Sequence, residues 1–279
     1  MGLFALSLVS VFSLLTVAAR ADVVDIGTAG AFGVLGGAGV VNNGSSDIFG
    51  SVAGSIATPV VTGFPPGTVT APGVLYLEGV ANGDTGTPFG DALAAYDNAE
   101  SLTPVNEGTD SLGTGDLGSL TPGVYTFNSA TVLLNGILLL DAQGSDTASW
   151  TFQIPFALTT AGASSIELVD APPGDFTGNI TWVVGSAATL GDNSEFLGSI
   201  ISQAAVVLDD SATLGCGRAI SLNASVTLNT NTVDTGCVVS AVTSAPEPGT
   251  LLLFPCGLFA LVFLMFHARA HRRSAPVLQ

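Results

Sequence analysis

Apolar residues recur in threes along the chain from residue 120 onward. Short patches in which apolar and polar residues alternate are separated by Gly, Asn, Asp and Ser at regular intervals, and this pattern is typical of short strands joined by turns. The repeat is clearest near its end, where Leu190, Leu208 and Leu228 are spaced by 18 and 20 residues. Each repeat then holds three strands of about six residues, which predicts the coils of a three-sided β-solenoid.

The alternation also predicts which residues face the core on each of the three sides. Insertions around 142–149 and 170–179 lengthen the earlier coils without changing the order of the sides. The first face is predicted to bury Tyr125, Phe127, Phe152, Ile154, Trp182, Val184, Ile200 and Ile220. The second is predicted to bury Val132, Leu134, Leu158, Leu190, Leu208 and Leu228, and the third Leu138, Leu140, Ile166, Leu168, Phe196, Leu214 and Val233.

One segment carries the signals of an α-helix. Thr87 is a favourable N-cap, Pro88 suits the first helical position and Asp91 complements the helix dipole. Small apolar residues then share one face at helical spacing, which suits a helix lying flat against the solenoid: Ala92, Ala95, Tyr96 and Ala99. Because residues 29–87 show a less regular version of the strand pattern, we predict a mainly β fold, a right-handed three-sided β-solenoid with one long α-helix packed alongside.

Composition divides the chain into a signal peptide (1–21), a solenoid domain (22–244) and a sorting segment (245–279). The solenoid domain holds 21 of the 22 acidic residues, only one of the five arginines and no lysine, so its formal charge is about −20. Nucleic-acid binding is excluded, because it depends on neutralising phosphates with Lys and Arg. Anionic membrane surfaces are disfavoured for the same reason.

The solenoid domain also lacks the residues for most catalysis. Both histidines lie near the C-terminus, so neither a Ser-His-Asp or Cys-His arrangement nor a His-based zinc site can be built. The adjacent acids Asp209 and Asp210 would point to opposite faces of a strand, and no calcium-loop motif is present. We predict no enzyme, with no catalytic residue, metal or cofactor, and rank an acidic-pocket glycosidase last among the possible functions.

The N-terminus reads as an export signal. An uncharged apolar run from Leu3 to Ala18 is followed by the small-x-small site Ala19-Arg20-Ala21. Because no Lys or Arg precedes the run, an N-terminal membrane anchor is the alternative. The short run and the good cleavage site favour the signal peptide.

The C-terminus resembles the PEP-CTERM sorting signal of Gram-negative bacteria. The resemblance implies transient anchoring in the inner membrane through this segment. It further implies cleavage near Pro246 by an exosortase-type protease, and delivery to the cell surface or extracellular matrix. A plain C-terminal anchor is the alternative. The parts that carry the resemblance are, in order, Pro246, Glu247 and Pro248, the apolar run Leu251–Phe266, and Arg269, Arg272 and Arg273.

Two of the three cysteines, Cys216 and Cys237, lie in the solenoid domain. An exported chain meets oxidising conditions, which predicts a disulfide. The two are 21 residues apart, about one coil, so we expect them on neighbouring coils near the open end of the solenoid. The alternative is two unpaired small residues in the core.

Seven stretches of the solenoid domain are similar to the microbial ice-binding, or antifreeze, proteins. The family resemblance implies a discontinuous β-helix with one long helix alongside and, as activity, adsorption to ice. The matching stretches are residues 32–36 (FGVLG), 61–67 (VTGFPPG), 92–96 (ALAAY), 120–125 (LTPGVY), 182–191 (WVVGSAATLG), 196–200 (FLGSI) and 217–219 (GRA).

Adsorption to ice would require a flat, charge-poor array of small hydroxyl and methyl groups, so the outward-facing rows decide which side works. The third face exposes Glu167, Glu195, Thr213 and Thr232, and we reject it for its acids. The first face exposes Thr126, Thr151, Thr181, Ser199 and Ser221. We prefer the second face, although one side must also receive the helix; its predicted ice-binding row is Thr131, Thr159, Thr189, Val207 and Thr227.

Two functions follow from the sequence. The first is binding to an ice crystal surface, by adsorption, at the cell surface or in secreted matrix. The alternative is a structural or adhesive extracellular surface protein that uses the same solenoid without ice affinity. The sorting segment fits both.

Overall fold

The computed structural model describes a solenoid built from residues 23–239. The solenoid belongs to a unit of the chain that ends at Ser240. The predicted signal peptide and sorting segment lie outside the described residues, and within the described part no helix is long and apolar enough to cross a membrane. The described residues are 23–57, 60–81, 83, 85–104, 106–107, 111–113 and 119–239.

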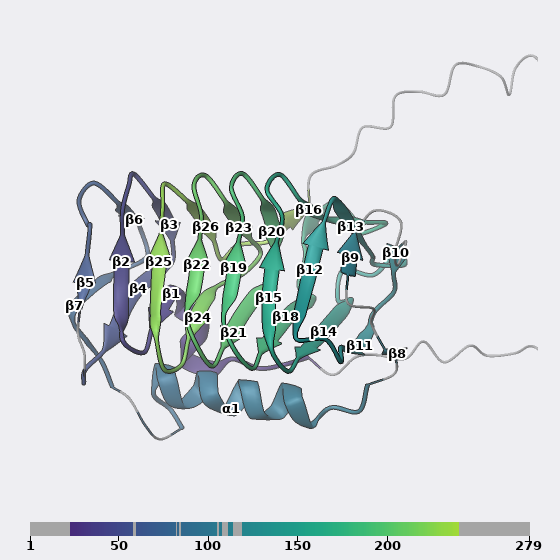
Figure 1. Cartoon of the computed structure of the whole chain (residues 1–279), viewed down its shortest axis with the longest axis horizontal. Helices are drawn as coiled ribbons and strands as arrows, with labels where there is room; N and C mark the ends of the chain where they lie inside the picture. Colours follow the sequence, from purple (N-terminus) through teal and green to yellow (C-terminus); the bar gives the residue numbers. More distant parts are fainter. Residues whose placement is uncertain are drawn as a thin grey trace, which may run out of the picture. The chain divides into compact units, whose positions relative to one another are not determined.

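Three parallel sheets form the sides of the solenoid, as predicted (Figure 1). In spatial order, the first sheet holds β7 (Leu75–Val80), β4 (Ser51–Ser55), β1 (Phe32–Gly36), β24 (Ala219–Ser221), β21 (Ser199–Ser202), β18 (Asn179–Val184), β14 (Ser149–Ile154), β11 (Gly123–Thr126) and β8 (Asn106–Glu107). The second holds β5 (Val61–Thr62), β2 (Gly39–Asn42), β25 (Ser225–Leu228), β22 (Val206–Leu208), β19 (Ala188–Leu190), β15 (Ala157–Thr160), β12 (Thr131–Asn135) and β9 (Ser111–Gly113). The third holds β10 (Ser119–Leu120), β13 (Ile137–Asp141), β16 (Ser165–Val169), β20 (Glu195–Leu197), β23 (Thr213–Gly215), β26 (Thr232–Asp234), β3 (Asp47–Phe49) and β6 (Thr68–Thr70).

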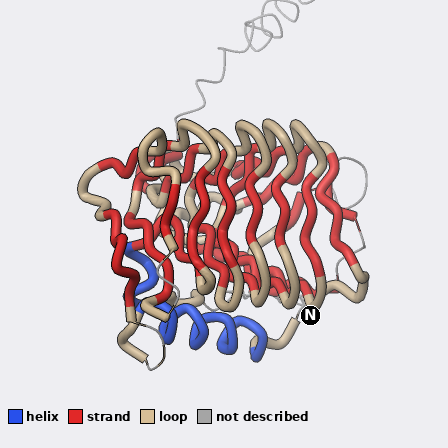
Figure 2. Tube along the Cα trace, turned by 60° about the vertical axis from the view of Figure 1, so that its left-hand side comes forward, coloured by secondary structure: helices blue, strands red, loops and turns tan. Residues whose placement is uncertain are grey.

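The coils are stacked in a different order from their order along the chain. The first coil, β1 to β3, pairs strand for strand with the last coil, β24 to β26. Helix α1 (Pro88–Ser101) carries the chain from the β7 end towards the β8 end, along one edge of the stacked coils (Figures 1 and 2). The last coil therefore lies inside the stack, and the expectation that the cysteine pair lies near an open end is wrong.

Helix α1 packs on the outer side of the first sheet. The hydroxyl of Thr87 caps it by accepting a hydrogen bond from the Gly90 amide at 3.2 Å, and Pro88 is its first residue, as predicted. At the other end, the Gln153 side chain of β14 donates to the carbonyl oxygens of Ala99 and Leu102, both at 2.8 Å. The buried residues of this contact form a second core, which includes Phe89, Ala92, Ala95, Tyr96 and Ala99 of the helix and Leu35, Val183, Ile201 and Ile220 of the sheet.

Stacked aromatic rings fill the main core between the three sheets. Phe152 and Trp182 stack with ring centroids 3.7 Å apart, and Tyr125 and Phe196 extend the stack on either side. The buried indole of Trp182 donates to the carbonyl oxygen of Leu197 at 3.0 Å. These rings bind three successive coils together, because Tyr125, Phe152 and Trp182 come from consecutive turns and Phe196 comes from the same turn as Trp182.

One inward position on the first face was predicted wrongly. Ile200 pairs with Ala219, not with Ile220. The corner before β24 holds one residue more than the corner before β21, and Cys216 in it has a positive φ of 52°. A shift of one residue turns a side chain to the other face of a strand, so Ile220 packs beneath helix α1 with Ile201.

Two short segments complete the described part. A 3-10 helix, η1 (Gly27–Ala31), precedes β1. Strands β17 (Gly174–Asp175) and β27 (Val238–Val239) form a separate antiparallel pair at the end of the solenoid domain.

Candidate functional site

The three sheets expose different chemistry on their outer faces. Within the described strands, the second sheet contains no charged residue. The first sheet is covered by helix α1 over much of its length. The strands of the third sheet carry five acids: Asp47, Asp141, Glu167, Glu195 and Asp234.

The predicted outward row of the first face is buried rather than exposed. Thr151 and Thr181 have at most 1% of their surface exposed, and Ser199 and Ser221 are buried as well. Only Thr126 remains partly exposed. Because four of these positions are buried, the first face offers no open row to a large flat partner. The shift before β24 also turns Ser221 inward, since its neighbour Ile220 packs beneath helix α1.

The third face is open but charged. Glu195, Thr213 and Thr232 lie side by side, as predicted, and Asp47 continues the row. Glu167 belongs to the neighbouring row, because Ser165 is the residue opposite Glu195. The carboxylate of Asp47 accepts hydrogen bonds from the hydroxyls of Thr68 and Thr70, at 2.7 and 2.9 Å.

The outer surface of the second sheet, which we call the second face, carries one continuous row of side chains. The predicted residues Thr159, Thr189, Val207 and Thr227 are consecutive members of it. Neighbouring members are about 4.8 Å apart, the spacing between paired strands. The complete row, which we call the main column, runs Ser111, Leu133, Thr159, Thr189, Val207, Thr227, Val41 and Thr62.

Sequence reasoning missed both ends of the main column. Val41 and Thr62 come from the N-terminal coils, which stack beyond the last coil. The resemblance to a discontinuous β-helix was the one signal that could have placed them there. Towards the other end, Leu133, with 38% of its surface exposed, stands where Thr131 was expected, and Ser111 follows it.

Thr131 lies in a second row beside the main column. It pairs with Ala157, two residues before the pair of Leu133 and Thr159. The turn into β15 holds two residues where the turn into β12 holds four, so the expected register was off by two residues. The strand registers continue this row through small side chains: Ala187, Ala205 and Ser225.

A dry layer supports the second face from within. The residues that alternate with the main column are fully buried, including Ala188 and Leu190 on either side of Thr189, as predicted. Because β-sheet hydrogen bonds and a close-packed core both resist movement, the exposed hydroxyl and methyl groups are held in fixed positions. The other buried aliphatic residues of this layer are Val40, Leu112, Val132, Leu134, Leu158, Val206, Leu208, Val226 and Leu228.

Comparison with known proteins places this architecture in one family. The family model described as Ice-binding-like matches residues 34–234. The chain belongs to the ice-binding-like family. An ice-binding protein of Nostoc sp. (strain HG1) is 38% identical over 263 residues, which cover 92% of each chain. An ice-binding protein of Flavobacterium frigoris (strain PS1) is 32% identical over 222 residues, 76% of each chain.

Solved structures of the ice-binding-like family have the same fold. The crystal structure of an ice-binding protein from the Antarctic ascomycete Antarctomyces psychrotrophicus matches with a TM-score of 0.65 and 33% identity, over 76% of this chain and 98% of that one. An ice-binding protein from an Antarctic biological consortium matches with a TM-score of 0.66 and 30% identity, over 77% of this chain and 92% of that one.

The corner between the third and first sheets holds a disulfide and several polar contacts. We call it the exit corner; it holds residues 170–178, 216–218 and 235–239. A disulfide joins Cys216 to Cys237 there. Arg218, the single cation of the solenoid domain, donates from Nε to the carbonyl oxygen of Gly30 at 2.8 Å, and burial lowers the pKa of its guanidinium.

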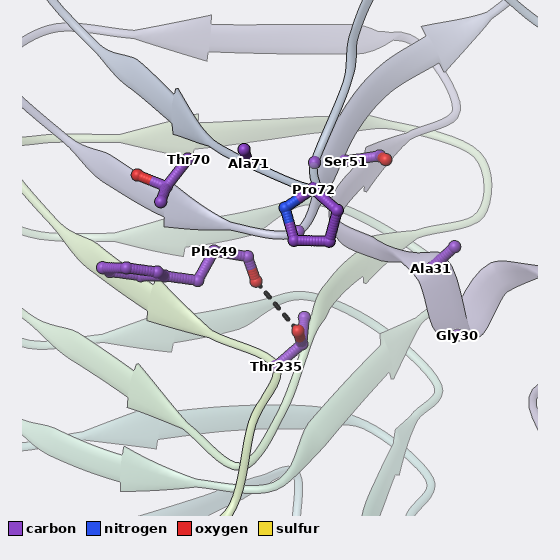
Figure 3. A pocket seen from close by; sticks show the side chains of 10 residues that line it. Gly30, Ala31, Phe49, Ser51, Thr70, Ala71, Pro72 and Thr235 are labelled. Carbon is purple, nitrogen blue, oxygen red and sulfur yellow. Dashed lines mark hydrogen bonds between the residues drawn. The ribbon is translucent and has the colours of Figure 1, made fainter.

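A shallow pocket lies along the exit corner, between η1 and the N-terminal coils (Figure 3). Its wall is mostly apolar or backbone, with Phe49, Pro72 and Ala31 beside Thr70 and Thr235. In the described part of the chain, no group of three His, Cys, Asp or Glu side chains is placed to hold a metal ion. The pocket therefore offers none of the acids and bases that hydrolytic chemistry needs.

Proposed function

We infer that this protein binds ice by adsorption, without chemistry, through its second face. The observation that carries the inference is the uncharged, continuous main column on the one open face whose strands lack acids. Small hydroxyl and methyl groups at fixed spacing can hold surface water in an ice-like order. Carboxylates bind water strongly in other geometries, so the third face would keep its water disordered.

The residues that we propose to contact ice are Thr159, Thr189, Val207 and Thr227, which are adjacent on the second face. Val41 and Thr62 extend the same row. Thr131 stands at the margin of the second face, in the row of small residues. No single side chain dominates in this arrangement, because adsorption depends on the fit of the whole row.

We further propose that the protein acts outside the cytoplasm, at the cell surface or in secreted matrix. The proposal rests on the apolar run and cleavage site of residues 1–21 and on the Pro246-Glu247-Pro248 segment with its apolar run and arginines. In this account an exosortase-type protease removes the sorting segment after transient anchoring in the inner membrane. The alternative of a surface protein without ice affinity is not favoured, since the matching relatives carry the name ice-binding protein.

Thermal hysteresis and ice recrystallisation inhibition, measured on purified residues 22–244, test the proposed function. We expect both activities at micromolar concentration, and their loss when the same sample is heat-unfolded. A folded domain with neither activity would contradict ice binding and return the structural or adhesive function to first place.

A further inference from the structure

The chain leaves the solenoid along a path that is fixed at several successive points. Thr235 donates from both its backbone amide and its hydroxyl to the carbonyl oxygen of Phe49, at 3.3 and 2.9 Å. Cys237 is bonded to Cys216. Its carbonyl oxygen accepts a hydrogen bond from the Phe176 amide at 2.9 Å, and β27 pairs with β17 directly afterwards.

The insertion at residues 170–178 helps to hold this exit, and its Phe176 also packs against Trp150 in the main core. The solenoid itself needs short corners, as at Gly198, where one residue lies between β20 and β21. The longer insertion contributes β17 and Phe176, whose backbone contacts are made to residues 237–239. Phe49, Cys216 and the insertion therefore hold the five consecutive residues 235–239 in place.

The exit corner lies opposite the second face. In a three-sided solenoid, each corner faces the side that it does not border, and the exit corner joins the third sheet to the first. The N-terminal segment is fixed at the same corner, where Asn179 donates to the carbonyl oxygen of Val24 at 3.0 Å and Arg218 to that of Gly30. Both ends of the described chain thus leave the second face clear (Figure 1).

We propose that the protein works while attached through its C-terminus, as a load-bearing link between a surface and ice. This inference rests on the proposed function and adds the direction in which the solenoid is held. The second face points away from the point of attachment. The surface holds the protein through the part of the chain after residue 239, and the ice crystal binds on the opposite side of the solenoid.

The disulfide gives this link its mechanical strength. A pull on the C-terminus that has separated β27 from β17 reaches Cys237 and passes through the sulfur bond to Cys216, between β23 and β24. Residues 217–236, the whole last coil, are then outside the path of the load. Without the disulfide, the same pull would peel β26 away from its two neighbours, β23 and β3.

Bead adhesion to ice tests the direction of attachment. Residues 22–244 are coupled to beads through a C-terminal biotin, or through a biotinylated cysteine introduced by Thr189→Cys on the second face or by Thr213→Cys on the third. We expect beads coupled at the C-terminus or at position 213 to adhere to ice, and beads coupled at position 189 to adhere at least tenfold less. Equal adhesion from all three, or failure of the C-terminally coupled beads while the free domain inhibits recrystallisation, would overturn the proposal. An inactive free domain would instead overturn ice binding itself.

Detachment under flow tests the load path. We expect C-terminally coupled beads that carry Cys216→Ser and Cys237→Ser to detach from ice at several-fold lower shear than wild-type beads. The free variant should still inhibit recrystallisation, which shows that it folds. Chemical reduction of wild-type beads already bound to ice gives a second measurement that needs no refolding. Unchanged shear resistance in both would show that the disulfide carries no load.

Discussion

The second and third sheets are built by the same coils yet present opposite surfaces to water. Each has eight strands in parallel register, and each buries a row of aliphatic or aromatic residues on its inner side. They differ in the outward positions alone, which carry Thr, Val and Ala on the second sheet and five acids on the third. The comparison shows that the solenoid supplies flatness and spacing to both sides, and that the outward residues select which side can order water as ice.

A bulky residue on the second sheet should reduce ice binding far more than a bulky residue on the third sheet. Thr189 is flanked by Thr159 and Val207 in the main column. Thr189→Tyr should hold the second face off the crystal and reduce recrystallisation inhibition by about tenfold or more, equivalent to about 1.4 kcal/mol or more of adsorption free energy.

The matched control is Thr213→Tyr, beside Glu195 on the third sheet. Its activity should stay close to that of the wild type, and circular dichroism should show that both variants fold. Full activity in Thr189→Tyr together with loss in Thr213→Tyr would mean that the third sheet is the working side.

Removal of the disulfide should lower the stability of the domain and leave its ice binding unchanged. The loop closed by Cys216 and Cys237 spans 21 residues, and its closure contributes about 3 kcal/mol to the free energy of unfolding in the chain-entropy model. Cys216→Ser with Cys237→Ser should lower Tm by about 6 to 12 °C. Near 0 °C, where the variant remains folded, its ice-binding activity should match that of the wild type. A loss of activity at this temperature would show that ice binding by the second face depends on the disulfide at the exit corner.

Acid should weaken the attachment of helix α1 to η1 and leave the surfaces of the second and third sheets unchanged. Hydrogen bonds from the Thr28 hydroxyl, the Gly86 amide and the Thr28 amide lower the pKa of Asp91 below its ordinary value. Because the folded-state pKa is depressed, this contribution is complete above the unfolded pKa of about 3.9 and is lost as the pH falls through the lower folded value.

Thermal unfolding of Asp91→Asn beside the wild type measures that contribution. Tm of the variant should be lower at pH 7, and the difference should close as the pH falls below the unfolded-state pKa and through the lowered pKa of Asp91. The decrease should be smaller than that caused by loss of the disulfide, since Asp91 lies at the surface. A difference that stays constant down to pH 2 would show that the charge of Asp91 plays no part.

A small gain should come from extending the hydroxyl row at its apolar end. Leu133 interrupts the Thr side chains of the main column beside Thr159 and is 38% exposed. Leu133→Thr should raise recrystallisation inhibition by less than about twofold, or below about 0.5 kcal/mol. A decrease would indicate that the apolar side chain itself contributes to adsorption.

Periodicity predicted the parts of the fold that depend on local pattern. The three sides, the core rows of the later coils and helix α1 all follow from alternation, spacing and the Thr87-Pro88 cap. Periodicity could not predict where residues from distant parts of the chain meet. Val41 joins the row of Thr227 only because the last coil stacks on the first, and no local pattern records that contact.

The errors in register have a different physical origin. Ile220 and Thr131 were each assigned to the wrong row, because a corner gained or lost residues without a change in the apolar pattern. A strand tolerates such a change wherever both of its faces bury apolar residues, as the first sheet does beneath helix α1. On the second sheet, an uncharged small residue suits either row.

Partitioning into ice tests the second face most directly. Equimolar wild-type domain, Thr189→Tyr and Thr213→Tyr are mixed, an ice crystal is grown slowly in the solution, and mass spectrometry measures each protein in the ice and in the liquid. We predict that wild type and Thr213→Tyr are enriched equally in the ice, while Thr189→Tyr stays in the liquid. Equal enrichment of Thr189→Tyr, or enrichment of none of the three, would contradict adsorption through the second face.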